Sequence, residues 1–298
     1  MTPALSGVKP TGSQFGETVK RIQHFVVAGV ALLLAAAVGI GASQGLRWFM
    51  VETPSMGSVA PRGTLVITQP IAASKLHVGQ IISFNPPTNI KQTYTHRIVA
   101  IGPHGITTKG DINGAADGWD LQPKEIIGRV VVALPGVGWL LKLLPIVAGG
   151  MLLVWALSIA VGNKHARKSI RLFGSSMVLT LAVVLVRPFS NYEVVQATPS
   201  ELGKNIVDYT VVNTGLMPMK FTSFNGQSFV IGDGELGVVH AQVNTATNFV
   251  DLGAHLALNG WQLALLTLLG AVPLLISIIH SQQAKREVAN AETAHAPA

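Results

Sequence analysis

The sequence lacks cysteine altogether and has few charged residues. Without cysteine, no disulfide can hold the fold together and no thiolate can act as a nucleophile. Charged residues make up only 12% of the 298 residues, whereas 49% are hydrophobic. Soluble globular domains contain about 25% charged residues. The shortage of charge therefore argues against an ordinary soluble protein and indicates a membrane protein.

Long apolar runs account for this imbalance. A membrane-spanning helix needs about 20 mostly apolar residues, and four runs reach or approach this length without a charge in their apolar centres. The predicted spans are residues 25–46, 143–162, 170–186 and 261–279. The first is predicted to be a retained anchor rather than a cleaved signal peptide, because its apolar run is long and the chemistry-bearing residues follow it directly.

The basic residues are concentrated in three short pieces between and beyond these spans. The N-terminal segment 1–24, the link 163–169 with Arg171 after it, and the tail 280–298 contain nine basic and three acidic residues. The rest of the chain is nearly neutral. The positive-inside rule places these three pieces, and thus both termini, in the cytoplasm. The formal net charge of +7 is therefore a signal of topology, and a nucleic-acid partner is not expected.

Two segments, 47–142 and 187–260, are then predicted to face outwards from the plasma membrane as small β domains. Both consist of short runs rich in Val, Ile and Thr, separated by turns containing Gly, Pro or Asn. Trp48 and Trp139 flank the first domain, and are expected either to lie at the membrane surface or merely to end the spans. The second domain has no catalytic arrangement, and a protein partner is a possible role for it. Its scattered acids are interpreted as solvated rather than as a cation site: Asp208, Asp233 and Glu235.

Three motifs of the first outer segment contain the residue types of nucleophilic acyl transfer. Ser55 follows the first span almost at once, His96 lies on a predicted strand, and Asp111 and Asp117 lie in a turn after another strand. A serine hydroxyl needs an imidazole to take its proton, and a carboxylate orients that imidazole. Spacing alone does not distinguish this site from a turn serine and a half-buried strand histidine.

The three motifs together resemble the type I signal peptidases, in particular the branch of the endoplasmic-reticulum enzymes and their prokaryotic relatives. The matching boxes are a Ser-Met box after an anchor helix (Thr53 to Met56), a Thr-His-Arg strand (Thr95 to Arg97) and a Thr-Lys-Gly-Asp-x-Asn box followed by a further Asp (Thr108 to Asp117). The resemblance extends over about residues 25–142. Histidine at position 96, where another bacterial branch has lysine, implies a Ser-His mechanism.

Carried over to this sequence, the resemblance implies a role for each matching residue. Ser55 is the expected nucleophile, and its backbone N–H is one oxyanion donor. Thr53 is a candidate second donor, and His96 is the expected base. Asp111 and Asp117 both match acidic positions, so either is a candidate partner of His96, with Asp120 as a third choice. Many members have Glu-Pro after Ser-Met, whereas Gly57 and Ser58 stand here, which makes Ser58 a rival nucleophile.

The resulting fold class is a membrane protein with four transmembrane α-helices, an all-β signal-peptidase-like catalytic domain outside the cytoplasm, and a second small β-rich domain there. The implied function is a serine endopeptidase that removes signal peptides from exported preproteins with small residues at positions −1 and −3. No cofactor or metal is expected. The alternative is a non-enzymatic membrane-anchored display, adhesion or assembly protein with two outer β domains.

Overall fold

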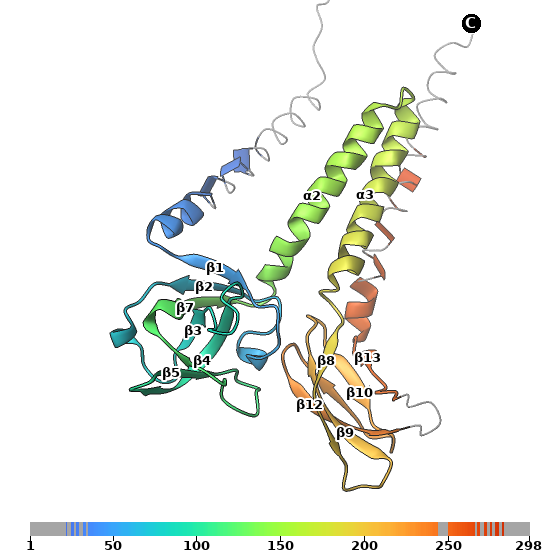
Figure 1. Ribbon diagram of the computed structural model, residues 1–298. Coiled ribbons are helices and arrows are strands. Elements are labelled where there is room, and N and C mark those ends of the chain that lie inside the picture. Colours follow the sequence, from blue (N-terminus) through green and yellow to red (C-terminus); the bar gives the residue numbers. More distant parts are fainter. Residues whose placement is uncertain are drawn as a thin grey trace, which may run out of the picture.

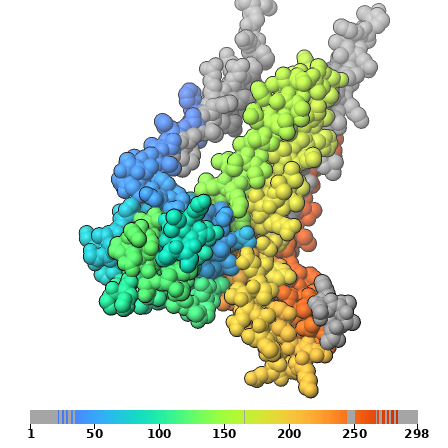
Figure 2. All heavy atoms as spheres, viewed as in Figure 1, coloured from blue at the N-terminus to red at the C-terminus, as the bar shows by residue number. Residues whose placement is uncertain are grey.

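The computed structural model describes residues 35–243 and 250–265 continuously, together with isolated residues between 22 and 33 and between 267 and 282. Two β domains lie side by side, and two long helices, α2 and α3, project away from them (Figure 1). Both domains are built from β-strands, as the short Val- and Thr-rich runs predicted. The space-filling view shows the two β domains in contact (Figure 2).

The first β domain is a single antiparallel sheet of seven strands in the order β1-β2-β7-β3-β4-β5-β6. Bulges occur in the β2–β7, β3–β7 and β4–β5 pairs, and bulges increase the local twist of a sheet. The strands are β1 (Arg47–Met50), β2 (Leu65–Gln69), β3 (Ile81–Phe84), β4 (Tyr94–Gly102), β5 (Gly105–Lys109), β6 (Asp120–Leu121) and β7 (Ile126–Leu134).

Five of these strands coincide with the apolar runs of the sequence, but β1 was not predicted. Arg47 to Met50 pair with Thr68 to Leu65 of β2, so Trp48 is part of the sheet. Trp139 is only 2% exposed, because its ring packs on Gly63, where a β-carbon would come within 1.9 Å of it. The burial of Trp139 does not fit a ring that lies at the membrane surface. Trp48 is half-buried on an edge strand, so the expectation for its side chain stays a prediction.

The helices α2 (Val137–Ile159) and α3 (Lys164–Val186) are long and apolar enough to cross a membrane, and only 6% of each apolar window is buried. They begin before the predicted spans 143–162 and 170–186, because α2 starts directly after Gly136 and α3 includes most of the basic link. Gly150 of α2 lies against Val178 of α3, and such small residues allow close helix packing. The spans predicted at 25–46 and 261–279 include residues outside the described part, so they stay predictions.

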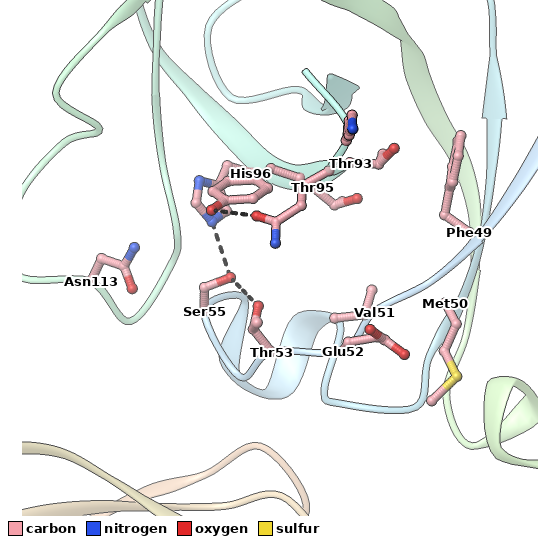
Figure 3. A pocket seen from close by; sticks show the side chains of 13 residues that line it. Phe49, Met50, Val51, Glu52, Thr53, Ser55, Thr93, Thr95, His96 and Asn113 are labelled. Carbon is pink, nitrogen blue, oxygen red and sulfur yellow. Dashed lines mark hydrogen bonds between the residues drawn. The ribbon is translucent and has the colours of Figure 1, made fainter. Parts of the chain in front are cut away.

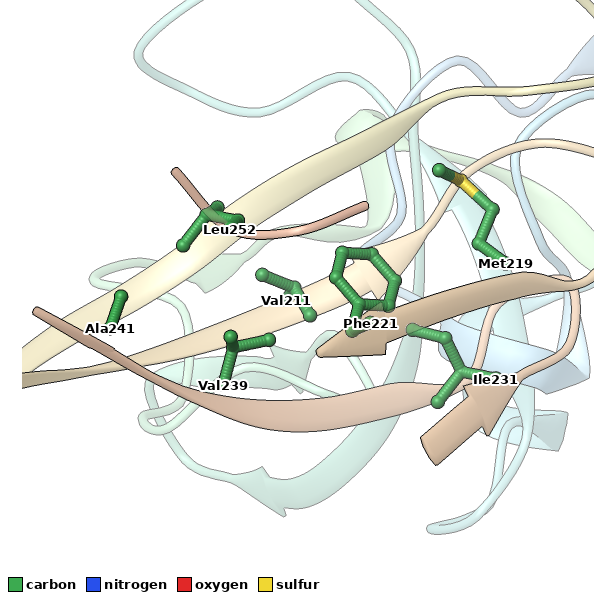
Figure 4. Packing of buried hydrophobic residues seen from close by; sticks show 7 residues of the cluster. All are labelled: Val211, Met219, Phe221, Ile231, Val239, Ala241 and Leu252. Carbon is green, nitrogen blue, oxygen red and sulfur yellow. The ribbon is translucent and has the colours of Figure 1, made fainter. Parts of the chain in front are cut away.

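The second β domain packs two three-stranded sheets against each other, with the orders β12-β9-β8 and β11-β10-β13. Phe221 is fully buried among the apolar side chains of its core (Figure 4). Its ring also contacts the rings of Tyr192 and Phe229. The predicted Asn225-Gly226 turn joins β10 to β11. The strands are β8 (Tyr192–Pro199), β9 (Ile206–Asn213), β10 (Met219–Thr222), β11 (Ser228–Ile231), β12 (Leu236–Gln242) and β13 (His255–Leu256).

The second domain contains one carboxyl group in an unfavourable environment. Burial raises the pKa of Asp233 to about 6 from its ordinary 3.8, and its Oδ1 is buried without a hydrogen-bond partner in the described part of the chain. Because the folded-state pKa is above the unfolded value, the protein gains stability from the neutral form at low pH. That contribution is lost as the pH rises from about 4 through about 6.

We therefore expect Asp233→Asn to stabilise the protein at pH 8 but not at pH 4. The gain at pH 8 is about 1 kcal/mol, taking 1.36 kcal/mol per pKa unit and discounting it because the group is half exposed. Chemical unfolding of the two proteins at both pH values measures this difference, with Glu201→Gln on the same domain as a control. An equal gain at pH 4 and pH 8 would contradict the assignment.

Candidate active site

The folded chain brings together three of the polar residues that the motifs indicated. Nε2 of His96 lies 3.0 Å from Oγ of Ser55 (Figure 3), and Nδ1 of the same ring lies 2.7 Å from Oδ2 of Asp117. An ionised carboxylate has only acceptor atoms, so Nδ1–H donates to Asp117. Nε2 then carries the lone pair and accepts the Ser55 hydroxyl proton. The result is a hydrogen-bonded row of a hydroxyl, an imidazole and a carboxylate.

The loop that carries Ser55 is held by the residue next to it. The side chain of Met56 is fully buried in a core cluster with Val51, Ala60 and Val66, so the Ser-Met box combines one apolar anchor with one accessible hydroxyl. The amide of Gly57 donates to the carbonyl of Pro54 at 2.8 Å, which closes a tight turn around Ser55. This anchoring positions Ser55 Oγ against the sheet.

His96 is positioned by strand β4 and by aromatic rings. It pairs with Ile82 of β3, and alternation along the strand turns His96 inwards and Arg97 to the opposite face. The His96 side chain is only 7% exposed. The rings of Phe84 and Tyr94 meet the imidazole edge-on at centroid distances of 6.0 Å and 5.8 Å. Two hydrogen bonds and the contacts with the two aromatic rings therefore fix the orientation of the imidazole.

Asp117 is held by Thr108, a fully buried residue of β5. The Asp117 amide donates to the Thr108 carbonyl at 2.8 Å, and the Thr108 hydroxyl donates to Asp117 Oδ2 at 2.5 Å. The carboxylate oxygen that accepts from His96 thus accepts a second hydrogen bond. Thr108 was not assigned a role from the sequence, although it opens the motif that contains Asp117.

The other two acidic candidates have different partners. Asp111 forms a two-pronged ion pair with Arg97, at 2.8 Å from Nε to Oδ1 and 2.7 Å from Nη2 to Oδ2. This hydrogen bonding to Asp111 raises the pKa of the Arg97 guanidinium above its ordinary value. Asp120, on β6, accepts a hydrogen bond from Thr107 at 2.6 Å. Among the three predicted acids, Asp117 is the one hydrogen-bonded to His96.

The two remaining hydroxyl candidates, Thr53 and Ser58, differ in their surroundings. Thr53 Oγ1 lies 3.3 Å from Ser55 Oγ, so its hydroxyl faces the same space. Ser58 lies on the short 3-10 helix Gly57–Val59 and is exposed. The hydrogen bond of His96 goes to Ser55 and not to Ser58.

A cleft of about 720 Å³ opens beside Ser55 and His96. One wall is the edge strand β1 with the residues that follow it, and the other is the segment that leads into β4 (Figure 3). The edge strand has backbone groups on its unpaired side, so the cleft suits an extended peptide. The lining residues are Phe49, Met50, Val51, Glu52, Thr53, Ser55, Lys91, Gln92, Thr93, Tyr94, Thr95, His96 and Asn113.

Comparison with known proteins gives one family match for this part of the chain. Residues 21–116 match the model of a family described as signal peptidase, peptidase S26. The match contains Ser55 and His96 and ends one residue before Asp117. No curated protein matches the chain. The segment that carries the Ser55–His96 pair therefore belongs to the type I signal peptidase family, a family of serine peptidases.

Proposed function

We propose that this protein is a membrane-bound signal peptidase, a serine endopeptidase that uses Ser55 as nucleophile and His96 as general base, with Asp117 orienting His96. The observation that carries the proposal is the hydrogen-bonded row of these three residues at the edge of a peptide-sized cleft. The family match, which includes Ser55 and His96, supports it independently. Signal peptidase activity on exported preproteins follows from that family.

In the proposed reaction, Ser55 Oγ attacks the scissile carbonyl carbon while His96 Nε2 takes its proton. The resulting imidazolium is stabilised by Asp117 at 2.7 Å from Nδ1. His96 then gives the proton to the leaving amine, which yields an acyl-enzyme. A water molecule, deprotonated by His96, hydrolyses the ester and restores Ser55. The Ser55 amide and the Thr53 hydroxyl are the proposed donors to the oxyanion.

Asp111 has a different role in this proposal. Its two-pronged pair with Arg97, which also donates to the Gly79 carbonyl at 2.8 Å, ties the end of β5 to β4. We propose that Asp111 stabilises the loop around the site rather than contacting His96. Two acids that the resemblance leaves equivalent thus receive separate roles from their hydrogen bonds.

The proposed substrate lies in the cleft as an extended segment beside β1, with small residues at positions −1 and −3. The two apolar helices and the family assignment both suggest a membrane-associated protein. We further propose the four spans and the cytoplasmic termini predicted from the charge distribution. The first β domain then lies on the outer membrane surface, since α2 begins three residues after β7 ends. That is where the cleavage site of an inserted signal peptide emerges.

The display or assembly alternative accounts for the second β domain equally well. It gives no reason for the hydrogen-bonded row, for the buried Thr108 that supports it, or for the cleft beside it. The two functions are separated by a single-atom change. Only the peptidase requires the Ser55 oxygen.

Ser55→Ala and His96→Ala are expected to abolish cleavage of a preprotein with Ala at −1 and −3. Each loses the nucleophile or the base, so the rate should drop by at least about 10³-fold. The purified proteins are assayed in detergent by gel shift of the preprotein, with Ser58→Ala as a matched control that retains activity. If Ser58→Ala is the inactive variant, the nucleophile assignment is wrong.

Asp117→Asn and Asp111→Asn are expected to behave differently. The first replaces the acceptor of the His96 Nδ1–H and should reduce kcat by about 10²–10⁴-fold, because the imidazole loses its correct tautomer. The second should change kcat by less than about tenfold, because Asp111 contacts Arg97 and not the imidazole. Steady-state kinetics on the two folded variants decide between them, and a reversed order would show that Asp111 is the partner of the base.

Thr53→Val removes the hydroxyl proposed to donate to the oxyanion while keeping the side-chain shape. We expect kcat to fall by about 10²-fold with little change in KM, because such a donor acts mainly in the transition state. Thr53→Ser keeps the hydroxyl and serves as the control. A rise in KM with kcat unchanged would place Thr53 in substrate binding instead.

A further inference from the structure

The second β domain contacts the loop that carries Ser55. Gly234, in the turn between β11 and β12, lies directly against the backbone of the nucleophile loop. A β-carbon on Gly234 would come within 2.5 Å of the Gly57 carbonyl oxygen and 2.8 Å of the Ser58 Cα. Gly234 also has a φ of +73°, which glycine adopts without strain. The contact therefore depends on a residue without a side chain.

The turn that makes this contact is a rigid part of the second domain. The Gly234 amide donates to the Asn213 carbonyl at 2.8 Å. Asn213 is fully buried, and its side-chain amide donates to the carbonyls of Met217 and Ile231. The position of Gly234 is thus set by the core of the second domain.

On the catalytic side, Gly57 is held between two segments. A β-carbon on Gly57 would lie 2.6 Å from Ile112 Cγ2 and 3.5 Å from the Gly234 carbonyl oxygen. The Ile112 amide in turn donates to the Ser55 carbonyl at 3.1 Å. The glycine two residues after the proposed nucleophile is therefore fixed by the loop before Asp117 on one side and by the second domain on the other.

Two further contacts join the second domain to neighbouring parts of the chain. Arg62, near the end of the nucleophile loop, donates from Nη1 to Glu193 Oε1 of β8 at 3.0 Å. The Leu216 side chain lies next to Gly136 at the start of α2, where a β-carbon would be 3.2 Å away. The second domain thus contacts the loop at both ends of the stretch that follows Ser55. Gly57 gives this stretch conformational freedom, and the second domain adds to the contacts within the first domain that restrict it.

We propose that the second β domain is a built-in positioning element of the peptidase: its turn 232–235 supports Gly57 and Ser58 and so sets the distance between Ser55 Oγ and His96 Nε2. Gly234 is a positioning residue and contacts no substrate. This inference rests on the proposed function, because it assigns the second domain to the geometry of that site. A misplacement of about 1 Å can cost about 10²-fold in rate, so a displaced loop should lower kcat.

Gly234→Ala tests the contact, and Gly226→Ala is its matched control. Both glycines have positive φ values, +73° and +82°, so both substitutions bring the same kind of backbone strain. Only position 234 has backbone atoms in the way, since nothing lies within 4 Å of a β-carbon at Gly226. The full-length protein in detergent is assayed for kcat and KM on a preprotein, for labelling of Ser55 by a small fluorophosphonate, and for its melting temperature.

We expect Gly234→Ala to lower both kcat and the labelling rate by at least about tenfold with KM nearly unchanged, and Gly226→Ala to leave both near the parent values. The labelling rate reports on the nucleophile without a peptide substrate, so a role in docking the preprotein would not change it. Parent values of kcat and labelling in a folded Gly234→Ala protein would overturn the inference.

Glu193→Ala covers the case in which Gly234→Ala does not fold. It breaks the half-exposed pair with Arg62, and Glu201→Ala on the same domain is the control. We expect a loss of about twofold to fivefold in kcat for Glu193→Ala alone, the size expected of such a pair, and equal values for both variants would refute the positioning role. A parent protein that neither cleaves nor labels at Ser55 would instead refute the proposed function itself.

Discussion

The hydrogen bond between His96 Nδ1 and Asp117 Oδ2 is the interaction on which the site depends. Both side chains are 7% exposed, so water has little access to either of them and does not readily replace the hydrogen bond. A buried polar group without a partner is costly, and this pair satisfies both groups while it fixes which ring nitrogen carries the proton. The lone pair on Nε2 then faces Ser55 at 3.0 Å. The chemistry proposed for Ser55 follows from that one tautomer.

The remaining structure of the first domain keeps these groups in register. Thr108 holds Asp117 from β5, the pairing of β3 with β4 sets His96, and the buried Met56 holds the loop of Ser55. Each of the three residues is therefore held by a different part of the first domain. The second domain adds a contact at Gly57. That contact supports the loop of Ser55, which lies outside the strands. A loop that must keep its hydroxyl accessible cannot be fixed by burial alone.

Much of the fold could be predicted because its signals are local. Val- and Thr-rich runs predicted β2, β3, β4, β5 and β7, and the Asn225-Gly226 dipeptide predicted a hairpin, since turns and strands depend on neighbouring residues. Strand β1 was not predicted, because its residues directly follow a long apolar run and were interpreted as the end of that run. Its place in the sheet depends on pairing with β2, and the residue pattern within β1 does not predict that contact. The burial of Trp139 was not predicted for a similar reason, since its partner Gly63 is distant in sequence.

The sequence by itself determined the residue types of the site, the two apolar helices between the β domains, and the family to which residues 21–116 belong. Only the tertiary structure decided which acid meets the imidazole. Asp111 and Asp117 are six positions apart in one turn and read alike, but Asp111 is drawn to Arg97 on one face of β4 and Asp117 to His96 on the other. Alternation along a strand sends adjacent side chains to opposite faces, and that geometry, rather than any property of the two carboxylates, separates their roles.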